Sequence, residues 1–176
     1  MMIKSLTAGL IALGLVGAPA LAVAQPGTSR LTSSDKSFVT EAAEGGQMEV
    51  ELGQLAQQKA TNDAVRQFGR RMVDDHGKAN GELAQLAGSK QVQLSDKPSR
   101  TTQREKDRLS KLSGAAFDRE YVKMMVSDHE KDVAAFKRES QQAKDQDVKA
   151  WAGKTLPTLE DHLQMIRQVQ GQLAKK

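Results

Sequence analysis

The segment VRQFGRRMVDDHGKANGELAQL, residues 65–86, carries the pattern from which the fold can be predicted. Steps of three and four residues along it pick out a nearly apolar stripe, made of Val65, Gly69, Met72, His76, Ala79, Leu83 and Leu86. This spacing is typical of an amphipathic α-helix with one face toward a core. The exception is His76, because a buried imidazole lowers stability unless it finds a hydrogen-bond partner or a ligand. The stretch therefore predicts a core helix that points one polar side chain inward.

Similar stripes predict three more long helices, and each stripe has one polar interruption. The four long helices are expected over about residues 35–59, 63–87, 115–143 and 147–173, with a short helix over 102–111. The interruptions are Glu49, His76, His129 and His162. Tight turns near residues 61–63 and 144–146 make each hairpin antiparallel, whereas residues 89–114, with Pro98, form a long crossover. Two hairpins and one long crossover are the connectivity of an all-α, ferritin-like four-helix bundle.

Helix-end signals refine these boundaries. Ser34 is the expected N-cap of the first helix, Asn62 that of the second, and Gly88 a plausible C-cap. Pro157 is expected to kink the last helix or break it. The glycine pair at residues 45–46 is expected to let a neighbouring helix approach closely.

The first 24 residues are expected to be a signal peptide rather than part of the fold. Lys4 gives a basic start, an apolar run follows over residues 6–16, and Ala22-Val23-Ala24 resembles a cleavage site. Residues 25–33 are expected to form a mobile leader and residues 34–176 the helical domain. No second apolar run follows, so we expect a bacterial periplasmic or secreted protein without a transmembrane anchor.

Composition argues against several partners and chemistries. The formal net charge is +4, but acidic and basic residues are interspersed as on a solvated helical surface. Aromatic residues make up 3% of the chain, too few for base-stacking platforms, so nucleic acid is not an expected partner. There is no cysteine, so packing rather than disulfides must supply stability. The sequence indicates neither a protein partner nor an oligomeric state.

Counting along the helices places the four polar interruptions at similar heights. Glu49 lies 12 residues before Thr61 and His76 lies 15 after it. His129 lies 16 residues before Asp145 and His162 lies 17 after it. With a rise of about 1.5 Å per residue, each pair falls within about one helical turn of the same level. Three imidazoles and a carboxylate are thus expected to converge inside the bundle.

This donor set suits a transition metal. His76, His129 and His162 are the candidate ligands with Glu49 as the fourth, a set suited to Zn, Fe or Mn. Met72 and Met125 each precede a histidine by four residues, and their thioethers would be alternate ligands for copper. Asp75, Asp128 and Asp161 directly precede the three histidines and are candidates for orienting imidazoles from behind the ligands.

Two other interpretations stay open at this point. The aspartates and histidines could form a buried hydrogen-bond network that fixes the helices without any ligand. An enzyme is less favoured, because the chain has no Gly-x-Ser-x-Gly motif, no phosphate-binding loop and no cysteine. The residues three before the histidines are Val73, Val126 and Leu159, which excludes the Glu-x-x-His motif of di-iron bundles.

Combined motifs also carry a family resemblance over residues 34–173. The motifs are Phe38, Glu49-Val50-Glu51-Leu52-Gly53, Phe68, Met72-Val73-Asp74-Asp75-His76, Phe117-Asp118, Tyr121, Met125, Asp128-His129 and Leu156-Pro157-Thr158-Leu159 with His162-Leu163. This pattern resembles an uncharacterised bacterial family of exported ferritin-like domains of unknown function. The resemblance implies a helical bundle in the cell envelope and no particular activity.

We therefore expect a non-catalytic binding module of the envelope that holds a transition metal inside. The alternative is a structural or stress-related interaction protein whose buried Asp–His network only fixes helix register.

Overall fold

The computed structural model describes residues 30–175, and within that range the chain is all-helical, with five helices and no strand. The helices are α1 (Ser33–Lys59), α2 (Asp63–Ser89), α3 (Arg100–Ser110), α4 (Gly114–Gln142) and α5 (Gln146–Leu173). The predicted signal peptide, residues 1–24, and most of the predicted leader lie outside the described residues. No helix in the described range is long and apolar enough to cross a membrane.

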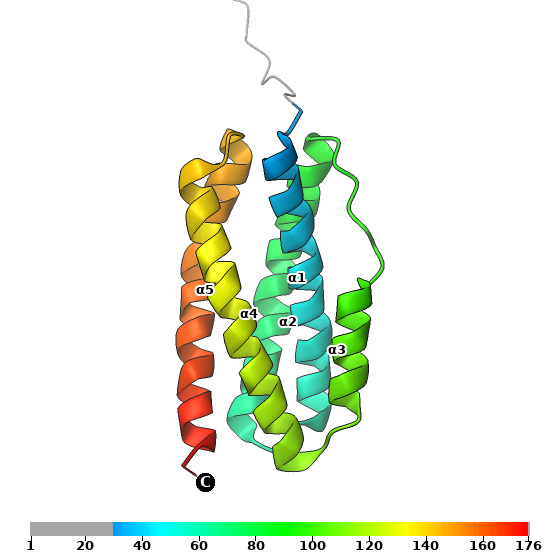
Figure 1. Ribbon diagram of the computed structural model, residues 1–176, viewed down its shortest axis with the longest axis vertical. Coiled ribbons are helices and arrows are strands. Elements are labelled where there is room, and N and C mark those ends of the chain that lie inside the picture. Colours follow the sequence, from blue (N-terminus) through cyan, green and yellow to red (C-terminus); the bar gives the residue numbers. More distant parts are fainter. Residues whose placement is uncertain (1–29, 176) are drawn as a thin grey trace, which may run out of the picture.

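The four long helices pair as two antiparallel hairpins, α1 with α2 and α4 with α5 (Figure 1). The predicted cap at Asn62 is confirmed, because its side chain accepts a hydrogen bond from the backbone N–H of Ala64. At the second turn the side chain of Asp145 accepts from the backbone N–H groups of Asp147 and Val148. Both connections are short and capped, which fixes the direction of the second helix in each hairpin.

A buried carboxylate joins the two hairpins at one end. Asp118 of α4 accepts hydrogen bonds from the backbone N–H groups of Thr61 and Asn62, at 3.1 and 2.9 Å. The hydroxyl of Thr61 donates to the same carboxylate at 2.6 Å. The α1–α2 turn is therefore held against α4 by a fully buried acceptor.

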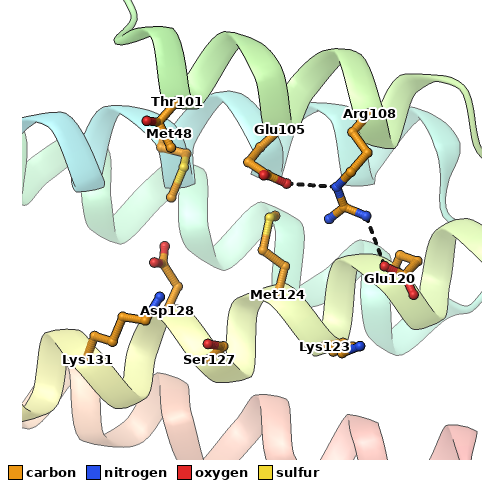
Figure 2. A pocket seen from close by; sticks show the side chains of 10 residues that line it. All are labelled: Met48, Thr101, Glu105, Arg108, Glu120, Lys123, Met124, Ser127, Asp128 and Lys131. Atoms are coloured by element: carbon orange, nitrogen blue, oxygen red, sulfur yellow. Dashed lines mark hydrogen bonds and ion pairs between the residues drawn. The ribbon is translucent and has the colours of Figure 1, made fainter.

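The long crossover carries α3, which lies outside the four long helices beside α1 and α4 (Figure 1). It begins at Arg100, two residues before the predicted start, because Ser99 caps it by accepting from the backbone N–H of Thr102. Figure 2 shows the Arg108 guanidinium between Glu105 of α3 and Glu120 of α4, with both contacts at 2.9 Å. The Arg108–Glu120 ion pair therefore links α3 to α4.

The prediction of Gly88 as the C-cap of α2 was wrong. The helix continues to Ser89, Lys90 is the C-cap, and Gln91 takes the positive φ of 57°. The backbone N–H of Gln91 donates to Gly88 O and that of Val92 to Ala87 O, which is the hydrogen-bond pattern of a Schellman motif. Val92 is buried beside the helix end, and this contact favours the left-handed residue at Gln91.

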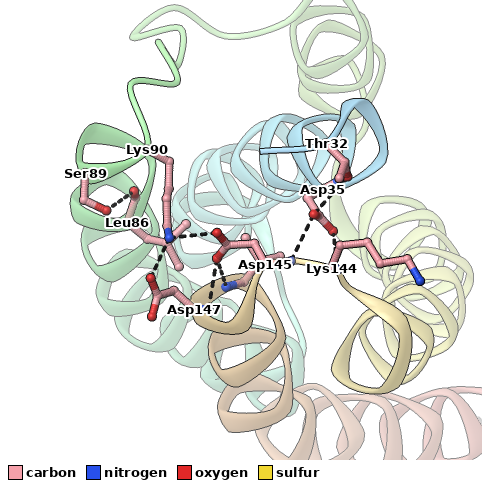
Figure 3. Close-up of polar contacts among 9 residues, drawn as sticks. Thr32, Asp35, Leu86, Ser89, Lys90, Lys144, Asp145 and Asp147 are labelled. Atoms are coloured by element: carbon pink, nitrogen blue, oxygen red, sulfur yellow. Dashed lines mark hydrogen bonds and ion pairs between the residues drawn. The ribbon is translucent and has the colours of Figure 1, made fainter. Parts of the chain in front are cut away.

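The start of α1 also differs from the prediction. Thr32, not Ser34, is the N-cap, and its side chain accepts from the backbone N–H of Asp35. Figure 3 shows the Asp35 carboxylate directed at the α4–α5 loop, where the backbone N–H groups of Lys144 and Asp145 donate to it at 3.0 and 3.1 Å. The cap two residues earlier puts Asp35 in the first turn of α1, where its carboxylate reaches this loop.

Pro157 does not break α5, which is continuous from Gln146 to Leu173. The proline is exposed, so its ring lies on the solvent side of the helix. The backbone hydrogen bond that a proline cannot donate is therefore absent on the solvent side of the helix rather than on the core side.

The core consists of two apolar clusters with a polar layer between them. One cluster contains Leu52, Phe68, Met125 and Ile166 among others, and the second contains Phe38, Leu83, Phe136 and Leu159. On each long helix the residue between the two clusters is one of the four polar interruptions, Glu49, His76, His129 and His162. The polar layer therefore consists of the four residues that interrupt the apolar stripes of the long helices.

The close approach of α1 and α2 occurs at Gly53 and Gly69 rather than at Gly45. A Cβ on Gly53 would lie 2.6 Å from Gly69 O, and one on Gly69 would lie 2.8 Å from Gly53 O. Nothing lies within 4 Å of a Cβ at Gly45, whereas Gly46 faces the side chain of Asn80. The two hairpin backbones therefore touch where both helices carry glycine.

We predict that Gly69→Ala lowers the free energy of unfolding by about 1–3 kcal/mol, because the added methyl meets backbone that cannot move aside. The matched control is Gly81→Ala on the same helix, where a Cβ meets nothing within 4 Å. That change should raise stability by up to about 1 kcal/mol through helix propensity. Urea titrations of both variants check the pair, and equal effects would refute the proposed contact.

Candidate metal centre

Three imidazoles from three helices meet in the polar layer. The ring centroid of His76 lies 5.8 Å from that of His129 and 5.3 Å from that of His162. The centroids of His129 and His162 are 5.4 Å apart. One nitrogen from each ring can be chosen so that the three nitrogens lie within 4.8 Å of one another. The convergence expected from counting along the helices is therefore present.

The cluster is closed off from solvent. His129 and His162 are 0% exposed, His76 is 6% exposed and Glu49 is 1% exposed. The ring of Phe68 packs edge-on to His129 and His162, with centroids 5.8 and 6.3 Å away. Polar atoms inside this layer can be satisfied only by each other, by trapped water or by a ligand.

One nitrogen of each imidazole lies within hydrogen-bond distance of a protein oxygen. His129 Nδ1 lies 3.0 Å from the backbone carbonyl oxygen of Met125, which can only accept, so this nitrogen carries the proton. His162 Nε2 lies 2.8 Å from Asp75 Oδ2, and His76 Nδ1 lies 2.8 Å from Glu49 Oε2. Such contacts fix both the orientation and the tautomer of an imidazole.

The other nitrogen of each ring has no hydrogen-bond partner among the described residues. These atoms are His76 Nε2, His129 Nε2 and His162 Nδ1, and all three are buried. Glu49 Oε1 is also without a hydrogen bond, 3.3 Å from His129 Nε2. Apart from this 3.3 Å approach, the four buried atoms have no polar partner among the described residues, an arrangement that costs stability unless water or a ligand occupies it.

Burial keeps the imidazoles neutral near pH 7. It lowers the pKa of His76 to about 4 and that of His162 to about 4, against the effect of nearby carboxylates. The pKa of His129 is lowered for the same reason, although Glu49 raises it. A neutral imidazole has a lone pair on one nitrogen, which is the form that binds metals.

Glu49 is a buried carboxyl whose surroundings oppose its ionisation. Burial raises the pKa of its carboxyl to about 8, although the nearby His129 lowers it. At neutral pH without a cation this carboxyl is largely protonated and can donate to His76 Nδ1, which keeps the His76 lone pair on Nδ1 and the ring proton on Nε2. Ionised, it accepts from that nitrogen and leaves His76 Nε2 free to bind. A bound cation would favour the second arrangement.

Of the three aspartates predicted to orient imidazoles, only Asp75 hydrogen bonds to one. It contacts His162 on another helix, and it also pairs with Arg71. Partial burial opposes ionisation of Asp75, but hydrogen bonds from His162 and Arg71 outweigh it and lower its pKa. Asp128 is half-buried and makes no hydrogen bond to an imidazole, and Asp161 is exposed. The expected role of Asp161 is therefore corrected, since a side chain on the solvent side of α5 does not reach the rings.

The two methionines proposed as copper ligands, Met72 and Met125, are fully buried in one apolar cluster. Met125 also contributes its backbone carbonyl to His129. Asp132 was missed by the sequence reasoning, although it lies near Glu49 and Asp128. Its spacing, three residues after His129 on α4, was the available signal, because residues three apart share a helix face.

We predict a pH dependence for the metal-free protein. A carboxyl with a folded pKa of about 8 and an ordinary value of 4.5 binds more protons folded than unfolded between these limits. Stability therefore falls as pH rises through this window. The neutral histidines oppose this only below their ordinary value of 6.5, so the fall should show between about pH 6.5 and 8.

The expected slope from Glu49 is about 1 kcal/mol per pH unit. Urea unfolding in EDTA at several pH values measures it, and Glu49→Gln, which cannot ionise, should reduce the slope but not remove it, because burial also raises the pKa of Asp132 to about 8. A parent protein whose stability rises from pH 6.5 to 8 would contradict the buried, proton-binding carboxyl.

The fold and the layer define an all-helical protein with a buried cluster of three histidines and one glutamate. Residues 20–169 match the family described as "Domain of unknown function (DUF4142)", and the chain belongs to this family. Its assignment to a family of unknown function agrees with the resemblance seen in the sequence. In a comparison with curated proteins, no sequence matches this chain.

Two solved structures share the fold. A DUF305 fragment from Deinococcus radiodurans superposes with a TM-score of 0.70 at 16% identity, covering 82% of this chain and 99% of that one. A DUF305 protein from Streptomyces coelicolor, described as a candidate secreted protein, has a TM-score of 0.68 at 16% identity, covering 81% and 93%. At this identity the likeness concerns the fold alone.

Proposed function

We propose that this chain is a ferritin-like four-helix bundle that binds one transition-metal ion in its interior. His76, His129 and His162 are the imidazole ligands, and Glu49 is the fourth ligand. The observation that carries the proposal is that all three rings have one nitrogen within hydrogen-bond distance of a protein oxygen and the other buried without a hydrogen-bond partner. A self-contained hydrogen-bond network would use both nitrogens of each ring.

The donor set indicates which ions fit. Three neutral imidazoles and a carboxylate are a tetrahedral set for Zn²⁺, and they also suit Fe or Mn. Tetrahedral Zn²⁺ with Zn–N bonds of about 2.0–2.1 Å places its ligand nitrogens about 3.3 Å apart. One nitrogen of each of the three histidines lies within 4.8 Å of the others, so small side-chain rotations would bring the imidazoles to this spacing. For copper, Met72 or Met125 would be the alternate ligand.

We infer that the protein works in the bacterial cell envelope, in the periplasm or outside the cell. The support is the signal-peptide pattern of residues 1–24 and the description of the similar Streptomyces coelicolor protein as a candidate secreted protein. The proposed role is a binding module for the ion rather than an enzyme, because four protein ligands would leave a tetrahedral ion no open position for substrate.

A structural role for the layer is the second candidate. It is favoured by the contact of Asp75 with both His162 and Arg71, which would fix helix register without any ion. Metal analysis of the untagged protein purified from the periplasm separates the two. One equivalent of bound metal supports the binding module, whereas metal-free protein that takes up neither Zn²⁺ nor Cu supports the structural role.

We predict that Asp75→Asn weakens Zn²⁺ binding by about 10–100-fold, the usual effect of losing a partner that orients a ligating histidine. The amide cannot carry the negative charge that favours the proton on His162 Nε2. The matched control is Asp74→Asn, which changes an exposed aspartate next to it on the same helix. Competition titrations with a chelating dye measure both, and equal affinities for the two variants would remove Asp75 from the site.

A further inference from the structure

A second group of potential ligands lies beside the histidines. This group consists of three carboxylates, those of Glu49, Asp128 and Asp132. One oxygen from each lies within 4.8 Å of the other two. Glu49 comes from α1 and the two aspartates from α4. The group contains oxygen donors only, unlike the imidazole cluster with which it shares Glu49.

Burial raises the pKa of Asp128 and Asp132, and Lys131 lies near enough to lower it in part, but among the described residues no ion pair neutralises either carboxylate. Neither Asp128 nor Asp132 forms a hydrogen bond or an ion pair among the described residues. Lys131 lies beside Asp128 on α4, but no ion pair joins the two (Figure 2). Glu49 is 1% exposed and its Oε1 has no hydrogen-bond partner. Three such groups within 4.8 Å repel one another unless a proton or a cation comes between them.

Space and access are both present at this group. A small cavity of about 20 Å³, enough for one water, is bordered by Glu49, His76 and Asp132. Asp128 lines a separate open groove of about 430 Å³ between α3 and α4 (Figure 2). The carboxylates therefore stand between solvent in the groove and the buried rings.

We propose that Glu49, Asp128 and Asp132 form a second cation site, which takes a divalent ion that prefers oxygen ligands and shares Glu49 with the imidazole site. Ions of the Mn²⁺ and Mg²⁺ class bind carboxylates and complete their coordination with water, which the groove supplies. Glu49 Oε2 lies 2.8 Å from His76 Nδ1, and Oε1, which has no hydrogen bond, lies 3.3 Å from His129 Nε2, so Glu49 would serve both sites by bridging the two ions.

The test uses untagged full-chain protein, first stripped with EDTA and then loaded with one equivalent of Zn²⁺. Mn²⁺ is titrated in, and the loss of the free Mn²⁺ signal in electron paramagnetic resonance reports binding. We expect one Mn²⁺ per chain in addition to the Zn²⁺. Asp132→Asn should weaken Mn²⁺ binding by about tenfold or more while Zn²⁺ stays bound, because a charged oxygen ligand is lost. Asp74→Asn, on the exposed side of α2, should leave both unchanged.

The inference fails if Zn²⁺-loaded protein binds no Mn²⁺ up to about 1 mM, the weak end of protein cation sites. It also fails if Asp132→Asn binds Mn²⁺ as well as the parent does. Protein that binds Mn²⁺ through Asp132 but never binds Zn²⁺ would refute the imidazole site and retain this one. Protein that binds Zn²⁺ but no Mn²⁺ gives the opposite result, so the two failures are distinguishable.

Discussion

His129→Ala should abolish tight binding of Zn²⁺ to this protein. His129 is 0% exposed, and the backbone carbonyl of Met125 fixes its Nδ1, so its Nε2 is the best-organised donor of the three rings. Loss of a ligand should exceed the roughly 10–100-fold effect of losing an orienting partner. Isothermal titration calorimetry on metal-free parent and variant measures the difference directly.

The comparison needs a control for folding, because a truncated core side chain leaves a cavity. Far-ultraviolet circular dichroism should show the same helical content in parent and variant. His76→Gln provides a second test at the least buried ring, and it should also lose tight binding. Retention of parental Zn²⁺ affinity in both folded variants would remove the histidines from the ligand set.

Added Zn²⁺ should raise the thermal stability of the parent protein markedly. An ion that binds only the native state contributes about 4 kcal/mol at a free concentration 1,000 times its Kd. For a chain of this length that corresponds to a rise in Tm of roughly 8–16 °C.

The matched control for this shift is His129→Ala under the same conditions. Its Tm should move far less with Zn²⁺ than that of the parent, because the variant lacks one of the imidazole ligands. A parent protein with the same Tm with and without Zn²⁺, Fe²⁺, Mn²⁺ and Cu would leave only a structural role for the buried histidines.

The helices and the inward residues could be predicted from the sequence because packing imposes a strict period. Each stripe recurs at three and four residues, and a polar residue inside a stripe must point where its neighbours point. Equal distances from the turns then brought His76, His129 and His162 to one level, as the centroid separations of 5.3–5.8 Å show.

The details that depend on neighbouring helices could not be predicted in the same way. Each Asp-His pair looks alike in sequence, yet Asp75 faces His162 while Asp161 faces solvent, because helix rotation decides which flank is covered. Asp132 is recognised as a possible ligand because the fold brings Glu49 of α1 close to it. The caps at Thr32 and Lys90 follow from contacts with a distant loop and with Val92, which local propensity does not contain.

The most direct test of the central claim is a crystal structure of Zn²⁺-soaked protein with data collected on both sides of the zinc absorption edge. We predict one strong anomalous peak inside the polar layer, within about 2.0–2.2 Å of nitrogens from His76, His129 and His162 and of a Glu49 oxygen. A peak only at surface carboxylates, or a polar layer filled by water alone, would contradict it.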